Sequence, residues 1–203
     1  MTTTLPDAKP RMTHRQVLEA LSGLLLGMFV SMLASTVVST SLPVIIHDLD
    51  GNQAAFTWVV TATLLTTAIS TPIWGKLADL TNRKALFQLA IVIFVLATAA
   101  AGFSTSPEML ISFRAVQGIG AGGLAALSQV LMADIISPRE RGRYMGLFGA
   151  VMAVATIGGP LLGGVITDSW GWRWNFFVAL PFAVLALILV QTTLHVPARP
   201  KKK

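Results

Sequence analysis

Six long stretches of this chain are almost free of charged residues, and this pattern limits the folds that are open to it. Each stretch has roughly the 20 apolar residues that an α-helix needs to cross a hydrocarbon core about 30 Å thick. A helix at the surface of a water-soluble bundle would show a charged face at regular helical spacing, and these stretches do not. We therefore predict an all-α membrane protein with six transmembrane helices, at about residues 20–46, 54–75, 85–103, 109–133, 144–167 and 174–194.

The composition agrees with a membrane protein. Of the 203 residues, 54% are apolar and 12% are charged, whereas about a quarter of the residues in soluble domains are charged. The sequence has no cysteine, which excludes a disulfide scaffold, thiolate metal sites and thiol catalysis within it.

The basic residues predict which ends of the helices face the cytoplasm. Alternate connections hold 13 of the 15 lysines and arginines, namely Lys9, Arg11, Arg15, Lys76, Arg83, Lys84, Arg139, Arg141, Arg143, Arg199 and residues 201–203. By the positive-inside rule these connections and both termini are cytoplasmic. We expect a leader at 1–15, a bundle at 16–195 that contacts the lipid bilayer, and a basic tail at 196–203. The net charge of +6 is then a topology signal, and no nucleic-acid partner is expected.

Hydroxyl side chains recur at helical spacing in the first stretch. Ser31, Ser35 and Ser39 share one face, and Thr36 and Thr40 lie beside it. The second stretch repeats this spacing with Thr63, Thr67 and Thr71. Such hydroxyls either line a solvated cavity or bond to the carbonyl four residues back and let helices pack closely.

Arg114 is a charge within a predicted span, where an arginine costs at least about 2.5–3.5 kcal/mol on insertion scales. It either extends toward the nearby interface or faces a cavity or a neighbouring helix. We favour the second hypothesis because Gln117 follows one turn later on the same face.

Glycines cluster in the fourth and fifth stretches, the latter with Gly158, Gly159, Pro160, Gly163 and Gly164. Small residues let helix backbones approach closely in lipid, and Pro160 removes one backbone donor. Both static packing and a flexible, gated helix fit this pattern.

Catalysis is not indicated. His14, His47 and His195 lie at the ends of the predicted spans, and no G-x-x-x-x-G-K-[ST] phosphate loop occurs. We expect neither an enzyme nor a metal or cofactor site.

Several segments resemble signatures of the major facilitator superfamily. Residues 75–84 read GKLADLTNRK and are similar to its G-x-L-a-D-r-x-G-r-k element, and 114–120, RAVQGIG, are similar to R-x-x-Q-G-x-G. Residues 159–164, GPLLGG, resemble the G-P-x-x-G-G antiporter signature, and 172–174 and 36–43 resemble the fourteen-helix drug-efflux branch. The elements occur in the expected order and on the expected predicted spans.

The resemblance implies roles for particular residues. Gly75, Asp79, Arg83 and Lys84 would form a cytoplasmic gating latch, although these charges also set topology. Beside the resemblance, the position of Asp134 near the cytoplasmic end of the fourth span places it to pair with Arg83. Arg114, Gln117, Ser35, Thr36 and Ser39 would line the cavity or take part in coupling. Gly159, Pro160, Gly163 and Gly164 would mark a proton-coupled exporter.

The resemblance also implies one half of a larger fold, built from two inverted three-helix repeats that rock against a second half. The missing C-terminal half would come from the same polypeptide, a separate chain or a second copy. Three residues depart from the family pattern. Asn82 stands where the family usually has glycine, Ala155 stands where the longer antiporter signature often has glycine, and Ala34 stands where branch members often carry an acidic residue. Proton coupling cannot therefore be assigned to this half by analogy.

We thus predict a secondary active transporter for proton-coupled efflux of drugs or amphiphilic small molecules, by family habit in a bacterial inner membrane. The alternative is a non-transporting six-helix membrane subunit or truncated remnant that assembles with a partner. A channel is less favoured because the sequence shows no ring of charge or repeated carbonyl filter.

Overall fold

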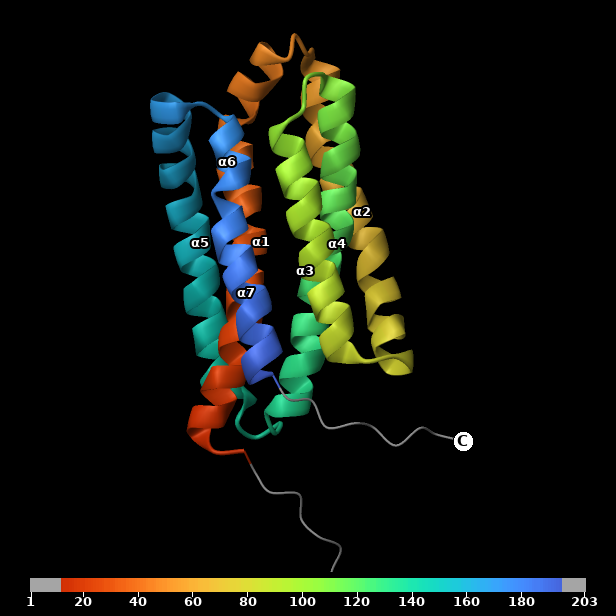
Figure 1. The fold of residues 1–203 in the computed structure, drawn as a ribbon, viewed down its shortest axis with the longest axis vertical. Coiled ribbons are helices and arrows are strands. Elements are labelled where there is room, and N and C mark those ends of the chain that lie inside the picture. Colours follow the sequence, from red (N-terminus) through yellow and green to blue (C-terminus); the bar gives the residue numbers. More distant parts are fainter. Residues whose placement is uncertain (1–11, 195–203) are drawn as a thin grey trace, which may run out of the picture.

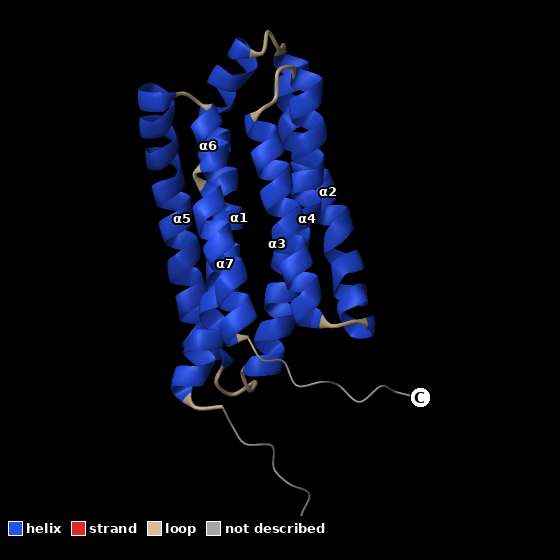
Figure 2. Cartoon of the chain, in the orientation of Figure 1, coloured by secondary structure: helices blue, strands red, loops and turns tan. Residues whose placement is uncertain are grey.

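The computed structural model describes residues 12–194, and within that range the chain is helical without a strand (Figure 2). The predicted all-α class is confirmed. Residues 1–11 of the predicted leader and the predicted tail at 196–203 lie outside the described residues. The helices are α1 (His14–Asp48), α2 (Gln53–Leu80), α3 (Arg83–Gly102), α4 (Pro107–Ile135), α5 (Arg141–Trp170), α6 (Arg173–Phe177) and α7 (Ala179–Thr193).

Most helices extend beyond the charge-poor stretches. Helix α1 begins at His14 because Thr13 forms a capping box, in which its hydroxyl accepts from the Gln16 amide and the Gln16 side chain accepts from the Thr13 amide. Polar turns of this kind lie where the chain leaves the apolar stretch, so a boundary based on charge stops short of them.

The sixth predicted span contains a local break that the sequence did not predict. A turn at Val178 separates α6 from α7. Pro181 has no amide hydrogen to donate to the carbonyl of Phe177, so the helical ladder is interrupted at that point. Together α6 and α7 still form one span of 21 residues, and the described chain has six spans long and apolar enough to cross a membrane.

The helices form two groups that lie side by side in Figure 1. In one group α4 packs against α2 and α3, and in the other α1 packs against α5 and α7. The first repeat supplies α1, α2 and α3, so each group mixes helices from both repeats. If α1 corresponds to α4, α2 to α5, and α3 to α6 with α7, the two groups have the same internal contacts, as an inverted repeat requires.

Glycines bring α4 close to its neighbours. A Cβ on Gly120 would lie 2.7 Å from the backbone nitrogen of Phe94 in α3. On the other side of α4, the Thr67 hydroxyl donates to the carbonyl of Gly118 at 3.1 Å. Close backbone approach thus fixes the group formed by α2, α3 and α4.

The two ends of the bundle differ in charge. The lower end in Figure 1, here called the basic end, has the start of α1, the α2–α3 turn and the α4–α5 connection, with Arg15, Lys84 and Arg139 among its residues. The opposite end carries Asp48 and Asp168. This separation is the one from which the topology was predicted.

Candidate functional site

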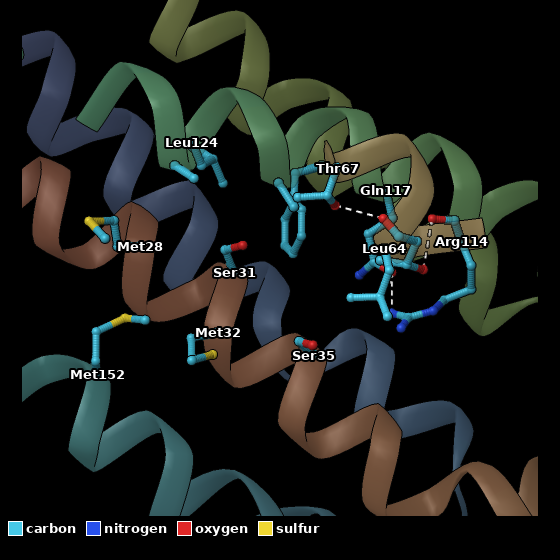
Figure 3. Close-up of a pocket in the computed structure, with 14 residues that line it drawn as sticks. Met28, Ser31, Met32, Ser35, Leu64, Thr67, Arg114, Gln117, Leu124 and Met152 are labelled. Carbon is cyan, nitrogen blue, oxygen red and sulfur yellow. Dashed lines mark hydrogen bonds between the residues drawn. The ribbon is translucent and has the colours of Figure 1, made fainter. Parts of the chain in front are cut away.

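A cavity of about 220 Å³ lies between the two helix groups, with side chains from α1 and α5 facing those from α2 and α4 (Figure 3). Helices α1 to α5 all contribute to its wall. The lining residues are Met28, Ser31, Met32, Ser35, Thr63, Leu64, Thr67, Phe94, Arg114, Gln117, Ala121, Leu124, Ala125 and Met152.

Arg114 reaches the cavity wall from α4, and it is 4% exposed. Its Nη1 donates to Oε1 of Gln117 at 2.6 Å, and Nε2 of Gln117 donates to the hydroxyl of Thr98 in α3 at 2.9 Å. Nε of Arg114 is buried without a hydrogen-bond partner among the described residues. None of the carboxylates between residues 12 and 194 forms an ion pair with this guanidinium.

The rest of the cavity wall is mostly apolar. Met28 and Met32 of α1 lie with Met152 of α5 on the side across from Leu64 and Leu124 (Figure 3). Methionine side chains are unbranched and polarisable, so they adapt to apolar surfaces of different shape. The cavity therefore combines one buried cation with a deformable apolar wall.

The predicted hydroxyl stripe of α1 divides between two surroundings. Ser35 lines the cavity with Arg114 and Gln117. Thr36 instead faces α5, where its hydroxyl donates to the carbonyl of Ala155 at 3.2 Å. Ser39 is exposed away from the cavity lining, and its hydroxyl donates to the carbonyl of Ser35 at 2.8 Å.

A second cluster lies at the basic end, where Arg83 begins α3. Its Nη1 contacts both carboxylate oxygens of Asp134 at 2.5 Å, which joins the start of α3 to the end of α4. Its Nη2 lies 3.2 Å from Asp79, and its Nε donates to the carbonyl of Ala78 at 3.0 Å. The Arg83 side chain is 8% exposed, against 20% for Asp134 and 70% for Asp79.

Lys84 and Gly75, which belong to the same predicted motif at residues 75–84, do not take part in this charge cluster. Nζ of Lys84 donates to the carbonyl of Gln191 in α7 at 3.0 Å, and so it joins the two helix groups. Gly75 lies one turn before Asp79, and a Cβ there would meet nothing within 4 Å.

The glycines of α5 have different environments. Gly159 and Gly163 are buried against α1, where a Cβ on Gly159 would collide with Thr36 and one on Gly163 would lie 2.9 Å from the Val37 carbonyl oxygen. Gly164 has nothing within 4 Å of its Cβ position, and Pro160 is exposed inside a helix that runs on to Trp170. Two glycines of the motif thus serve helix packing.

Sequence reasoning missed the apolar wall of the cavity. Met28 and Met32 share a helix face with Ser31 and Ser35, so the hydroxyl stripe was the signal that could have located them. Met152 could not be found this way, because an apolar residue on an apolar helix does not indicate which neighbour it faces.

The sequence profile of the Major Facilitator Superfamily matches residues 24–203. The chain belongs to the Major Facilitator Superfamily. It is 42% identical to the efflux pump dotC of Dothistroma septosporum over 198 residues, which cover 96% of this chain and 34% of the pump. It is 38% identical to the multidrug transporter protein MdtP of Bacillus subtilis, over 86% of this chain and 32% of the transporter.

Solved structures of superfamily transporters have the same fold. A bacterial homologue of the human lysosomal transporter Spinster, in an inward-facing conformation, superposes with a TM-score of 0.79 at 20% identity, over 97% of this chain and 47% of that one. The proton:xylose symporter XylE gives 0.79 at 16% identity, over 89% and 45%. The chain spans about a third of the curated relatives and about half of these solved transporters.

The partly buried ion pair between Arg83 and Asp134 at the basic end predicts a stability loss. In Asp134→Asn the Arg83 guanidinium keeps Asp79 but loses its closer anionic partner. We expect the free energy of unfolding to fall by about 3 kcal/mol, the low end for a broken buried pair, because Asp134 is 20% exposed. Denaturant unfolding of the purified protein in detergent measures this change. The control Glu19→Gln breaks an exposed pair with Arg15 and should cost less than about 1 kcal/mol, and equal losses in the two variants would contradict the assignment.

The α5 motif offers a matched pair of neighbouring substitutions. Gly163→Ala places a methyl group against the α1 backbone, and overpacking of this kind costs about 1–3 kcal/mol. Gly164→Ala enters open space and should leave stability unchanged or slightly raise it, because alanine favours a helix. Thermal melting of the two purified variants measures the difference, and identical melting temperatures would show that α1 and α5 are not packed as described.

Proposed function

We propose that this chain is the N-terminal six-helix half of a proton-coupled exporter of amphiphilic small molecules. The observation that carries the proposal is the cavity between the helix groups, where buried Arg114 and Gln117 lie across from methionines. The names of the relatives as an efflux pump and a multidrug transporter support export as the direction.

The orientation in the membrane follows from the charge at the two ends. Because Lys and Arg gather at the basic end, that end would lie on the cytoplasmic side of the cell membrane, and both termini would lie on the same side. The cluster of Asp79, Arg83 and Asp134 then lies at the cytoplasmic boundary. There it is positioned to act as a latch between this half and the second one.

The cavity wall sets the kind of substrate. An adaptable apolar surface binds amphiphiles of varied shape mainly through the hydrophobic effect. Arg114 adds one fixed charge, and its free Nε is a donor for an acceptor group on a substrate or on the second half. Specificity would therefore depend on both halves.

We infer that the second half of the transporter supplies the carboxylate that binds the proton. The described carboxylates do not line the cavity, and Ala34 occupies the position where an acidic residue is often found in the branch. Arg114 would take part in coupling by electrostatic interaction with a carboxylate that is supplied from across the cavity.

The function predicts a loss of export in Arg114→Gln. This variant keeps a hydrogen-bonding side chain but removes the cavity charge. We expect the initial efflux rate from cells that express the complete protein to fall at least about tenfold, equivalent to about 1.4 kcal/mol. Efflux is followed with one neutral, one cationic and one anionic fluorescent amphiphile in preloaded cells.

Arg15→Gln is the matched control, because it removes one positive charge from a side chain that is 89% exposed at the basic end. Membrane protein levels are compared by immunoblot. Unchanged efflux in Arg114→Gln would remove Arg114 from the mechanism. No efflux of any of the three probes by the unmodified protein would favour the non-transporting subunit.

A further inference from the structure

Residues 75–84, which join α2 to α3 at the basic end, have a counterpart with a similar sequence at the other end of the bundle. Residues 164–173 read GVITDSWGWR and align without a gap with residues 75–84, GKLADLTNRK. Glycine occupies the first position of both segments, aspartate the fifth, and a basic residue the tenth. At the eighth position Gly171, at φ 97°, stands where the first segment has Asn82.

The two segments occupy corresponding places in the inverted repeat. The first ends α2 and begins α3, and the second ends α5 and begins α6. Helix α2 packs on α4, and α5 packs on α1. The segments lie at opposite ends of the bundle (Figure 1).

The ninth residue of each segment binds a carboxylate at the end of a corresponding helix. Arg83 binds Asp134 at the end of α4 at 2.5 Å. Trp172 donates through Nε1 to Asp48 at the end of α1 at 3.0 Å. The partner helices, α4 and α1, are themselves corresponding members of the two repeats.

The tenth residue of each segment joins the two helix groups. Lys84 at the start of α3 donates to the carbonyl of Gln191 at the end of α7. Arg173 at the start of α6 donates to the carbonyls of Gly102 and Ser104 at the end of α3, at 2.9 and 2.8 Å. Its guanidinium carbon also lies 4.4 Å from the centre of the Trp172 ring. The ninth and tenth residues of the two segments therefore make corresponding contacts, in agreement with the sequence similarity.

The fifth residue of the second segment is left available. Asp79 lies beside Arg83, whereas the side chain of Asp168 is exposed and makes no hydrogen bond or ion pair with residues 12–194. Arg173 does not neutralise it, because that guanidinium is directed to the carbonyls at the end of α3.

Asp168 also continues an exposed apolar face of α5. Val154, Leu161 and Val165 are 61%, 68% and 63% exposed, and Asp168 follows them at helical spacing. Helix α5 is the least buried of the six spans, and α2 is the next least buried. Two corresponding helices thus leave an apolar face uncovered and end it with an aspartate.

We propose that residues 164–173 form a second gating element at the end opposite the basic end, in which Asp168 contacts the second half of the transporter when that end is closed. Trp172 and Arg173 are the positioning residues that fix the element to α1 and α3. The exposed apolar face of α5 would pack against the second half of the transporter, since the relatives are about three times as long as this chain. The proposal rests on the proposed function, and it makes the two elements opposing latches of one alternating-access cycle.

The test measures on which side of the membrane the cavity is open. A single cysteine replaces Ala125, which lines the cavity, in a complete transporter from which any cysteine outside this chain has been removed. A membrane-impermeant maleimide is added to right-side-out or inside-out vesicles, and initial labelling rates are compared. Asp168→Asn should raise labelling from the outer side about fivefold or more and lower it from the cytoplasmic side. Asp79→Asn should do the reverse.

Trp172→Phe removes the donor to Asp48 but keeps an aromatic ring, and it should shift labelling in the same direction as Asp168→Asn. Glu108→Gln is the matched control, because it neutralises another carboxylate at the same end that is outside the pattern. A merely structural role would lower the melting temperature or alter labelling from both sides alike.

The outcomes separate this proposal from the proposed function. If Asp79→Asn shifts the labelling and Asp168→Asn leaves it at the parental rates, the second gate is overturned and the transporter stands. If Asp168→Asn and Glu108→Gln shift labelling equally, general charge and not the pattern is responsible, and the proposal is again overturned. If the parent is labelled from both sides at rates that no transported amphiphile alters, the proposed function fails and the gate fails with it.

Discussion

The lack of water inside a bilayer is the constraint on which this structure depends. Backbone polar groups must be paired within the chain, so each span is helical. The hydroxyls of Thr36 and Thr67 donate to carbonyls both within their own helices and on neighbouring helices. The same constraint removes most of the hydrophobic attraction between helices. Packing therefore relies on small residues such as Gly120 and Gly163, which bring backbones into contact.

Cross-links made by charged side chains gather at the ends of the bundle, where water is available. Lys84 and Arg173 join the two helix groups at opposite ends, whereas the cavity lies between the groups. Arg114 is the exception, since it is a cation buried beside the cavity and held by Gln117. A charge kept in such a place without a carboxylate partner among residues 12–194 is costly, which is why it is the strongest candidate for a functional residue.

The sequence predicted those features that depend on charge or on helical spacing. The six spans followed from the charge-poor stretches, and the pairing of Arg83 with Asp134 followed from two charges at neighbouring span ends. Spacing also placed Ser35 on the face that lines the cavity, but it could not show that Thr36 on the adjoining face meets α5. The break at Val178 was missed because Pro181 lies in an uninterrupted apolar run. Which neighbour an apolar helix face meets is decided by packing across the whole bundle.

We propose that this bundle is half of a transporter driven by a proton gradient. The most direct measurement is uptake of a fluorescent amphiphile by proteoliposomes that contain only the purified complete protein, with and without an imposed pH gradient. We expect accumulation that requires the gradient and collapses when a protonophore is added. Equal signals from protein-containing and protein-free vesicles under the gradient would contradict it.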